Sequence, residues 1–478
     1  MTATLTTLVS FNNRPLPFGS LIADANGNLF GTTAHGGASN EGTVFELVKS
    51  GSTYSLTTLI SFNGSNGAFP FGSLIADANG NLFGTTHGDG ANNDGTVFEL
   101  VKDGSTYTLT TLVSFNGSNG AAPSAGLIAD ANGNLFGTTY GDGINNYGTV
   151  FELVKSGSTY TLTTLVSFNG SNGANPMSGL IADANGNLFG TTYGGGANNY
   201  GTVFELVKSG SAYTFTTLVS FNVSNGACPT SGLIADVNGD LFGTTYVGGA
   251  NGAGTVFELV KSGSTYSLTT LVSFNDSNGG NPASGLIADA NGDLFGTTYA
   301  GGANGDGTVF ELVKSGSTYT LATLISFNGS NGVAPVGGLI ADANGDLFGT
   351  TEGDGANSQG TVFEITNSGF VIVTPTVLAD RTGVKVGATV TADAAHGVLA
   401  NDTDPITGDT LHVSAVNGLA INVGHTITIM GSLGSLTLGS DGSYTYAAFS
   451  NDVLPASGVG QDVFTYTARV RVVRPARP

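Results

Sequence analysis

The sequence predicts an all-β protein in which a seven-bladed β-propeller, residues 1–370, precedes an immunoglobulin-like β-sandwich, residues 374–468. The motif Gly-Thr-Val-Phe-Glu-[Leu/Ile] recurs with a constant spacing of 53 residues. Its glycines are Gly42, Gly95, Gly148, Gly201, Gly254, Gly307 and Gly360. A fixed period of this size indicates stacked units, because one such unit cannot bury its apolar face alone. The chain also has 76 glycines and only 10% charged residues, which is typical of turn-rich β proteins.

Each repeat has the pattern of four strands, which the third copy illustrates. Residues 126–130 are a nearly continuous apolar run, as expected for a strand that is covered on both faces. The Asp-Ala-Asn-Gly-Asn segment 130–134 predicts a tight hairpin, and residues 135–139 predict the second strand. Residues 148–155 predict the third strand, and the alternating segment 107–115 shows the pattern of the fourth. A buried first strand and a half-exposed fourth strand match the inside-to-outside order of a propeller blade.

The number of strands predicts a closed ring. The chain starts with a strand of the fourth type, residues 5–11, and seven copies of the first three strands follow. The N-terminal strand therefore completes the seventh blade beside residues 360–365, which leaves no exposed sheet edge. A competing assignment makes residues 370–373 the last outer strand. An open solenoid would need altered capping repeats, and the first and last copies show little such change.

Charge and composition exclude several classes of function. The formal net charge is −21, so nucleic acid and anionic membranes are unfavourable partners. Cys228 is the only cysteine, which excludes a disulfide framework and a thiolate metal cluster. No apolar run approaches the ~18 residues that are needed to cross a bilayer. The N-terminus lacks the pattern of a signal peptide and begins inside a strand, so we expect the chain to be part of a longer secreted protein.

Differences between the copies collect in two loops, from the second strand to the third and from the fourth strand to the next repeat. Alternate connections of an up-and-down sheet lie on the same side, so both loops share one face of the ring, which we call the variable face. Tyrosines on this face could stack on sugar rings and hydrogen-bond their hydroxyls. The alternative is that the rings pack over the glycine-rich loops. The predicted ligand-binding residues are His87, Tyr140, Tyr147, Tyr193, Tyr200, Tyr246, Tyr299 and Glu352.

Three further patterns carry candidate chemistry. The motif glutamate, Glu46 in the first copy, occupies seven equivalent positions, whereas catalysis needs carboxylates in different environments. We therefore predict that it caps backbone N–H groups between blades. The hairpin that begins at Asp24 has its glycine at position 4 rather than at position 6 of a calcium loop, which favours a turn. An enzymatic alternative, a polysaccharide lyase or hydrolase, would use His87, Glu352 and Asp354 on the variable face.

The 53-residue period stops near Thr374, and the segments Gly-Val-Leu-Ala-Asn-Asp-Thr-Asp-Pro and Asp-Gly-Ser-Tyr-Thr-Tyr follow. These motifs resemble the cadherin-like or VCBS-type repeats of large bacterial surface proteins. The resemblance implies an extracellular β-sandwich that calcium often rigidifies, with Asp402, Asp404 and Asp409 as candidate metal ligands. An acidic turn without an ion is the alternative. Residues 469–478 are arginine-rich, and we expect an irregular basic tail there.

The repeating unit, with Asp-Ala-Asn-Gly-Asn-Leu-Phe-Gly-Thr-Thr and Gly-Thr-Val-Phe-Glu-Leu, resembles the GloVer tandem repeat of the Gloeobacter/Verrucomicrobia type over residues 1–370. The family brings no established reaction, so the resemblance supplies no catalytic residue, and we do not expect an enzyme. We expect a secreted or cell-surface binding and adhesion protein whose variable face takes a glycan or a surface protein. The lyase or hydrolase and a structural spacer without a ligand are the alternatives. Calcium in the C-terminal domain is the one cofactor expected, and no direct membrane insertion is expected.

Overall fold

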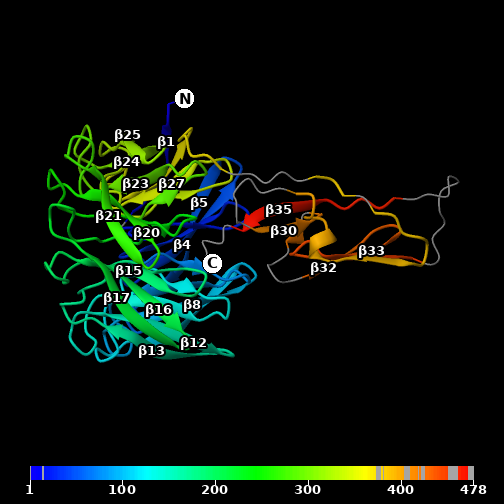
Figure 1. The fold of residues 1–478 in the computed structure, drawn as a ribbon, viewed down its shortest axis with the longest axis horizontal. Coiled ribbons are helices and arrows are strands. Elements are labelled where there is room, and N and C mark those ends of the chain that lie inside the picture. Colours follow the sequence, from blue (N-terminus) through cyan, green and yellow to red (C-terminus); the bar gives the residue numbers. More distant parts are fainter. Residues whose placement is uncertain are drawn as a thin grey trace. The chain divides into compact units, whose positions relative to one another are not determined.

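The computed structural model describes residues 2–12, 15–372, 378–380, 382–402, 410–417, 419–420, 426–449 and 461–471. The chain divides into two compact units, the repeat unit Met1–Val371 and the C-terminal unit Ile372–Arg477. Every regular element in the described residues is a β-strand except one short 3-10 helix, η1 (Ala394–His396), so the chain is all-β (Figure 1). Across these residues, none of the helical structure has the length and apolarity of a membrane span.

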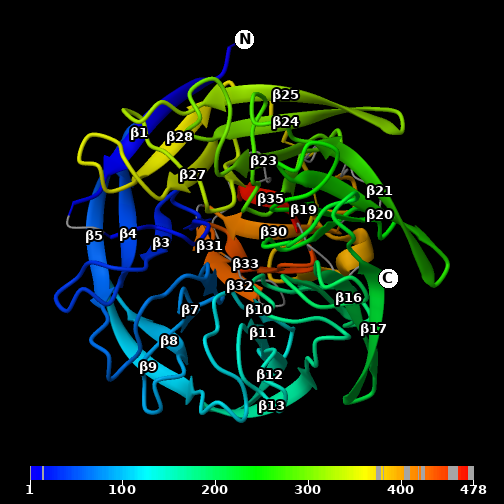
Figure 2. The same cartoon turned by 90° about the vertical axis from the view of Figure 1, so that its left-hand side faces the viewer.

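Each repeat forms a four-stranded antiparallel sheet, and seven such sheets surround a common centre (Figure 2). First strands are β2 (Ile22–Ala23), β6 (Ile75–Ala76), β10 (Ile128–Ala129), β14 (Ile181–Ala182), β18 (Ile234–Ala235), β22 (Ile287–Ala288) and β26 (Ile340–Ala341). Second strands are β3 (Leu29–Thr33), β7 (Leu82–Thr86), β11 (Leu135–Thr139), β15 (Leu188–Thr192), β19 (Leu241–Thr245), β23 (Leu294–Thr298) and β27 (Leu347–Thr351). This arrangement is consistent with a β-propeller.

Third strands are β4 (Thr43–Ser50), β8 (Thr96–Asp103), β12 (Thr149–Ser156), β16 (Thr202–Ser209), β20 (Thr255–Ser262), β24 (Thr308–Ser315) and β28 (Thr361–Thr366). Fourth strands, on the outside in Figure 2, are β5 (Thr53–Ser61), β9 (Thr106–Ser114), β13 (Thr159–Ser167), β17 (Ala212–Ser220), β21 (Thr265–Ser273), β25 (Thr318–Ser326) and β1 (Thr4–Ser10). We number the sheets 1 to 7 by their first strands and call the boundary between two neighbouring sheets a seam.

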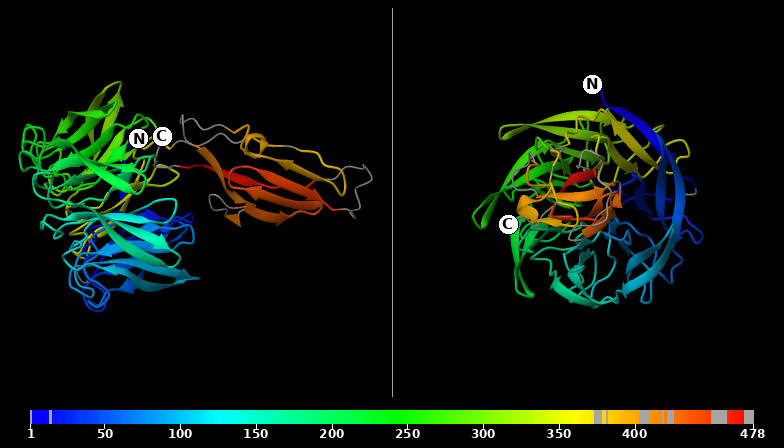
Figure 3. Two further views of the ribbon diagram at one scale, coloured as in Figure 1. Left: turned by 60° about the horizontal axis from the view of Figure 1, so that its bottom comes forward. Right: turned by 90° about the vertical axis from the view of Figure 1, so that its right-hand side faces the viewer.

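The N-terminal strand completes sheet 7, as the sequence predicts. β1 is antiparallel to β28, with Leu5 opposite Ile365 and Ser10 opposite Thr361. The strand order of this sheet is β26-β27-β28-β1, and the blue β1 lies outside the yellow β28 in both Figure 2 and the right panel of Figure 3. Residues 370–372, the described part of the competing outer strand, form no strand. The first and last repeats of the chain are therefore hydrogen-bonded to one another.

The apolar core of the repeat unit lies in the seams rather than within single sheets. At the seam between sheets 1 and 2, Phe30 and Phe62 of one sheet pack with Leu82 and Phe98 of the next. Phe62 and Phe98 meet edge to face, with ring centroids 5.2 Å apart. Equivalent pairs recur at the other six seams with separations of 5.2–5.3 Å. Because each cluster needs two repeats, no single repeat can bury its own apolar residues.

Two glycines of every repeat are required by close packing. Gly148, the first residue of the repeated motif, has φ of +87°, and a Cβ there would collide with the carbonyl oxygen of Thr139. A Cβ on Gly137 would lie 2.6 Å from Cζ of Phe151, which occupies the core of the sheet. Side chains at either position would displace backbone or core atoms, which explains why all seven copies carry glycine at both.

The seam between sheets 6 and 7 is closed by a different residue from the others. At three other seams a fourth-strand tyrosine packs on a second-strand phenylalanine, as Tyr319 does on Phe242 with ring centroids 6.4 Å apart. The equivalent position near β1 is Ala3. Phe370, which follows β28, packs on Phe295 instead, with ring centroids 5.0 Å apart. The segment after the last repeat therefore supplies the aromatic ring that β1 lacks.

Hydrogen bonds hold this closing segment in place. Ser368 Oγ donates to the carbonyl oxygen of Gly345 over 2.8 Å, and the backbone N–H of Val371 donates to Asp289 Oδ2 over 3.1 Å. The N–H of Ala290 in turn donates to the carbonyl of Val371 over 3.1 Å. The repeat unit thus extends to residue 371, beyond its last strand.

The Phe370→Ala variant is expected to lose about 2 kcal/mol of unfolding free energy, because it leaves a void over Phe295 in a half-buried site. Urea unfolding of the full chain measures the loss. Ala3→Tyr restores the ring from the β1 side, so the double variant should recover part of it. An unchanged midpoint for Phe370→Ala would show that the segment does not close the seam.

The C-terminal unit contains two antiparallel sheets, with strand orders β29-β34-β33-β32 and β31-β30-β35. The strands are β29 (Thr389–Ala392), β30 (Thr410–Val416), β31 (Leu419–Ala420), β32 (Thr426–Met430), β33 (Gly434–Gly439), β34 (Tyr444–Ala448) and β35 (Tyr466–Arg471). Val413 and Val416 of β30 pack with Leu436 and Leu438 of β33. A small apolar core therefore joins the two sheets.

Residues 469–471 are not part of an irregular tail as predicted, and residues 472–478 lie outside the described residues. β35 continues to Arg471, with Arg469 opposite His412 and Arg471 opposite Thr410 of β30. The arginines do not end the strand because the backbone of β30 still offers hydrogen-bonding partners at these positions.

Candidate functional site

Seven equivalent residues form a ring on the variable face, and we call their places the ring positions. They directly follow the second strands and are Ala34, His87, Tyr140, Tyr193, Tyr246, Tyr299 and Glu352. The backbone N–H of each donates, over 2.9–3.2 Å, to the carbonyl oxygen of a loop residue that precedes a proline. That loop residue has φ between +47° and +58° in every repeat. The same backbone geometry thus holds all seven positions, and only the side chains differ.

Four of the ring positions carry tyrosine in succession, which we call the tyrosine row: Tyr140, Tyr193, Tyr246 and Tyr299. The rings of Tyr246 and Tyr299 lie 6.5 Å apart between centroids and are tilted by 59°. The pKa of Tyr193 is raised, chiefly by the nearby thiol of Cys228 and then by desolvation. The hydroxyls of Tyr140 and Tyr246 contribute smaller effects in the same direction. The structure therefore brings these four predicted ligand-binding residues together across sheets 3 to 6.

Glu352 and His87 stand at the two ends of the tyrosine row. The nearby carboxylate of Glu352, followed by desolvation, raises the pKa of Tyr299, and burial raises the pKa of Glu352 itself. His87 Nδ1 lies 2.9 Å from Ser124 Oγ, and its ring meets that of Phe71 edge to face at 5.2 Å. Burial lowers the pKa of His87. Each end of the row therefore carries a titratable group that is partly withdrawn from water.

The three residues of the enzymatic alternative are not assembled. Ala34, which is buried, occupies the ring position between His87 and Glu352. Asp354 is exposed in the loop that follows Glu352. Within the part of the chain that the structure describes, no hydrogen bond or ion pair links His87 to Glu352 or Asp354.

Tyr147 and Tyr200 lie at seams, farther along the same loops. Their side chains are 42% and 41% exposed. The Tyr147 ring covers Gly170 of the next loop, since Cζ would lie 3.4 Å from a Cβ on that glycine. The backbone carbonyl of Tyr147 accepts a hydrogen bond from the N–H of Asn175 over 2.8 Å. The backbone carbonyl of Tyr200 accepts one from the N–H of Cys228 over 2.9 Å. These two tyrosines are outside the row, and Tyr147 fits the alternative in which the ring packs over a glycine-rich loop.

Sequence reasoning did not foresee an aromatic group beside His87. Phe18 and Phe71 meet edge to face at 5.1 Å, and Phe71 also contacts His87. A second pair, His35 and Phe69, lies 5.2 Å apart. The signal was present, because only the first two repeats carry phenylalanine directly after the loop proline. This group adds aromatic side chains to the variable face over sheets 1 and 2.

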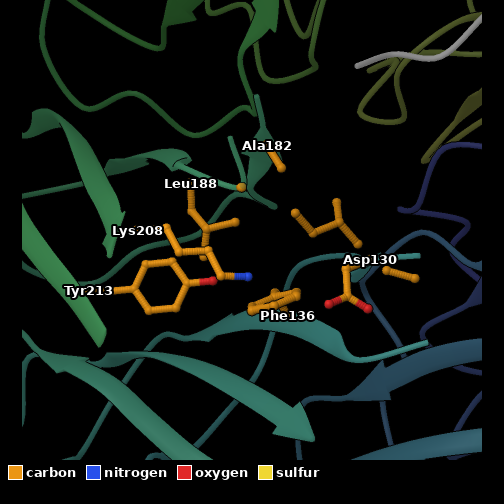
Figure 4. Close-up of a pocket in the computed structure, with 9 residues that line it drawn as sticks. Asp130, Phe136, Ala182, Leu188, Lys208 and Tyr213 are labelled. Atoms are coloured by element: carbon orange, nitrogen blue, oxygen red, sulfur yellow. The ribbon is translucent and has the colours of Figure 1, made fainter. Parts of the chain in front are cut away.

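The opposite face, which carries the constant hairpins, has narrow grooves at its seams. Asp130 and Phe136 of sheet 3 and Lys208 and Tyr213 of sheet 4 line the groove shown in Figure 4. An equivalent groove lies between sheets 1 and 2. Lys208 Nζ lies 5.7 Å from the centre of the Tyr213 ring, and burial raises the pKa of Tyr213 to about 12. These grooves are apolar, repeated and closely filled by the chain's own side chains.

The motif glutamates do not cap backbone groups, so that prediction was wrong. None of the seven accepts a hydrogen bond from the described residues, and burial raises the pKa of each. Glu152 pairs through its backbone with Phe136 on one side and Thr163 on the other. The neighbouring N–H groups are therefore already used by the sheet, and the carboxylate contributes to raising the pKa of Tyr213 across the seam.

The hairpin aspartates act as turn residues. Asp130 Oδ1 accepts from the backbone N–H groups of Asn132 and Asn134, and Oδ2 accepts from Asn134 Nδ2, all over 2.9 Å. The carboxylate is thus satisfied by its own loop, as the turn interpretation predicts.

One of the three candidate metal ligands lies in the described residues. Asp402 Oδ1 accepts from the N–H of Leu378 over 2.7 Å, and Oδ2 accepts from the hydroxyl of Tyr466 over 3.0 Å. Asp404 and Asp409 lie outside the described residues. Among the residues that are described, no group of three His, Cys, Asp or Glu side chains gathers around a common point. Asp402 on its own serves as an acceptor within the fold.

Comparisons with known proteins agree with this architecture. The sequence model of the Gloeobacter/Verrucomicrobia repeat matches residues 1–129, 103–267 and 208–400. The extracellular domain of a protein assigned as a one-component system from B. thetaiotaomicron is 11% identical, with a TM-score of 0.50. That likeness covers 91% of this chain and 46% of the other, so the chain spans less than half of that structure.

A protein assigned as a 6-phosphogluconolactonase from Bacteroides uniformis is 16% identical, with a TM-score of 0.48, over 72% of this chain and 96% of its own. No curated protein matches this chain. At these identities, likeness to solved structures concerns the fold alone.

Proposed function

Because the chain belongs to the Gloeobacter/Verrucomicrobia repeat family, we propose that it is a secreted or cell-surface bacterial binding protein whose ligand, a glycan or a surface protein, docks on the variable face. The observation that carries this proposal is the tyrosine row. Four tyrosines and Glu352 occupy adjacent ring positions on the one face where the repeats differ. Variable side chains on a constant scaffold are the arrangement typical of a recognition surface.

The architecture supports this role. The seven sheets act as the blades of a closed propeller, and the two sheets of the C-terminal unit form an immunoglobulin-like, cadherin-like module that spaces the propeller from an anchor. In the ring, the backbone behind every side chain is fixed by a hydrogen bond to a strained loop residue. A preorganised backbone reduces the entropy that is lost on binding.

Binding is expected to fall at least about tenfold in Tyr193→Ala and in Tyr246→Ala, because aromatic side chains at the centre of an interface contribute most of its energy. Glycan arrays and pull-downs from cell-surface extracts with the full chain identify the ligand, and titration of each variant measures the loss. Asp103→Ser is a matched control, since Asp103 lies on the hairpin face and the six other repeats carry serine there. If no ligand depends on either tyrosine, the chain is a structural spacer.

A second candidate, a polysaccharide lyase or hydrolase, is favoured by one observation. Burial raises the pKa of Glu352 toward neutrality, as suits a general acid, and lowers the pKa of His87, which keeps its imidazole neutral and able to accept a proton. Turnover of an acidic polysaccharide that His87→Ala abolishes would support this candidate over a binding protein.

Calcium at Asp402 is a further proposal for the C-terminal unit, because its carboxylate already orders Leu378 and Tyr466 at one end of the sandwich. Thermal unfolding of the full chain with calcium and with a chelator tests it.

A further inference from the structure

Within the described residues of the repeat unit, no lysine or arginine side chain lies in the loops of the variable face. Eight acidic residues lie in its loops: Glu41, Asp89, Asp94, Asp142, Asp276, Asp306, Glu352 and Asp354. In the described residues of the repeat unit, the only Lys or Arg side chains are six lysines at the ends of third strands, toward the hairpin face. Each lysine ammonium lies 5.6–5.9 Å from the centre of the tyrosine ring opposite it. The described part of the variable face therefore carries eight acidic side chains and no lysine or arginine.

Two pairs of these carboxylates face each other across seams. A Cβ built on Gly64 would lie 3.1 Å from Glu41 Oε2 and 3.2 Å from Asp89 Oδ2. Glu41 Oε2 is buried and has no hydrogen-bond partner in the described residues. Two carboxylates beside one glycine concentrate negative charge, which an external cation can pair with. The seam between sheets 1 and 2 is thus suited to an external cationic group.

A second seam has the same arrangement. A Cβ on Gly117, between sheets 2 and 3, would lie 2.9 Å from Asp142 Oδ2 and 3.7 Å from Asp94 Oδ2. In both seams the carboxylate oxygens lie directly against the glycine, at the place where a Cβ would stand.

The acidic residues occur together or not at all when the seven repeats are compared. Three seams carry an acid at both places, Glu41 with Asp89, Asp94 with Asp142, and Asp306 with Asp354. The other four seams carry neither, as with Tyr147 and Gly195. This match is expected if a ligand needs both carboxylates.

The second acid of each pair is an aspartate with a positive φ, a backbone conformation that favours glycine. Asp89, Asp142 and Asp354 have φ of +59°, +53° and +54°. The four other repeats have glycine at this place, with φ of +74° to +84°. Glycine adopts this left-handed conformation without strain, so aspartate there costs stability of about 1 kcal/mol. A stability cost accepted in three repeats indicates that the carboxylates serve another purpose.

The part of the variable face that lacks paired acids carries the tyrosine row. The three acidic seams lie between sheets 6 and 7, sheets 1 and 2, and sheets 2 and 3, and the tyrosine row covers sheets 3 to 6. The 59° tilt between Tyr246 and Tyr299 gives no flat platform for a sugar ring, but each ring still offers a face to a cation. Guanidinium groups both stack on tyrosine and pair with carboxylates.

We propose that the occupant of the variable face is a protein segment rich in lysine and arginine. Its side chains pair with the carboxylates across the three acidic seams and lie over the tyrosine row. This inference rests on the proposed function and specifies the chemistry of the same face.

The test is the titration of the full chain with a fluorescent twelve-residue peptide of alternating arginine, lysine and glycine, followed by anisotropy at about 0.02 M and about 0.15 M salt. We expect binding that weakens with salt, and no binding of a glutamate-rich peptide of equal length. The triple variant Asp89→Gly, Asp142→Gly, Asp354→Gly, which uses residues from other repeats, should bind the basic peptide at least about tenfold more weakly. Its melting temperature should equal or exceed that of the unchanged chain, so lost binding cannot be attributed to unfolding.

Asp103→Ser removes one charge from the hairpin face and should bind as the unchanged chain does. Equal binding by the triple variant, or an equal loss in Asp103→Ser, would overturn the inference. So would preference for an amino-sugar oligomer over the peptide. The basic peptide could fail to bind while a neutral ligand binds in a way that depends on Tyr193 and Tyr246. That result would contradict this inference but would still support the proposed function.

Discussion

A chain that begins at Asn12 is expected to lose its closed repeat unit. Removal of β1 strips Leu5, Val9 and Phe11 from the two core clusters that join sheet 7 to its neighbours. It also exposes the full edge of β28, whose unpaired N–H and C=O groups can bind another chain. The shortened protein should therefore associate and unfold at a much lower temperature than the full chain, which size-exclusion chromatography and thermal unfolding measure.

A peptide of residues 2–12 supplied in trans provides the control, since it can occupy the same edge and restore the monomer. A shortened chain that stays monomeric with an unchanged melting temperature would mean that the ring does not depend on β1.

Phe204→Ala is expected to cost about 3–5 kcal/mol of unfolding free energy, as large-to-small changes of buried phenylalanine do. Phe204 is fully buried and contacts the rings of Phe168 at 5.3 Å and Phe215 at 5.6 Å. The void would open in a seam, so it weakens the contact between sheets 3 and 4 as well as sheet 4 itself. The urea midpoint of the full chain measures the effect.

Phe215→Leu is the matched control for this site, because the six other fourth strands carry leucine at the equivalent place. It should cost less than about 1.5 kcal/mol. Similar losses for the two variants would contradict the assignment of Phe204 to the structural core of the seam.

The pattern of repeats allowed the strand order and the closing strand to be predicted, because both depend on spacing that is visible in the chain. The pairing of Leu5 with Ile365 follows once the strands are counted. The role of Phe370 could not be predicted in this way, since it depends on Ala3 being too small to cover Phe295. Substitutions that compensate across a seam are visible only when the two residues are seen in contact.

The candidate site was predicted in part. The tyrosine row follows from equal positions in consecutive repeats, so Tyr193 and Tyr246 had to be near one another in any ring. The glutamate prediction failed because it assumed that N–H groups near Glu152 were free, whereas both sides of its strand are paired. The facing of Glu41 and Asp89 was missed because the two residues belong to different repeats and no local motif contains both.

Because the seams share the same core positions, the order of the repeats in the sequence can change without loss of packing. The seams from sheets 1–2 to sheets 5–6 use the same core positions, so one repeat can follow any other without altering the packing. Only the last seam, under Phe370, marks where the series must end. Reordering of internal repeats would therefore rearrange the loops of the variable face while leaving the packing of each sheet intact.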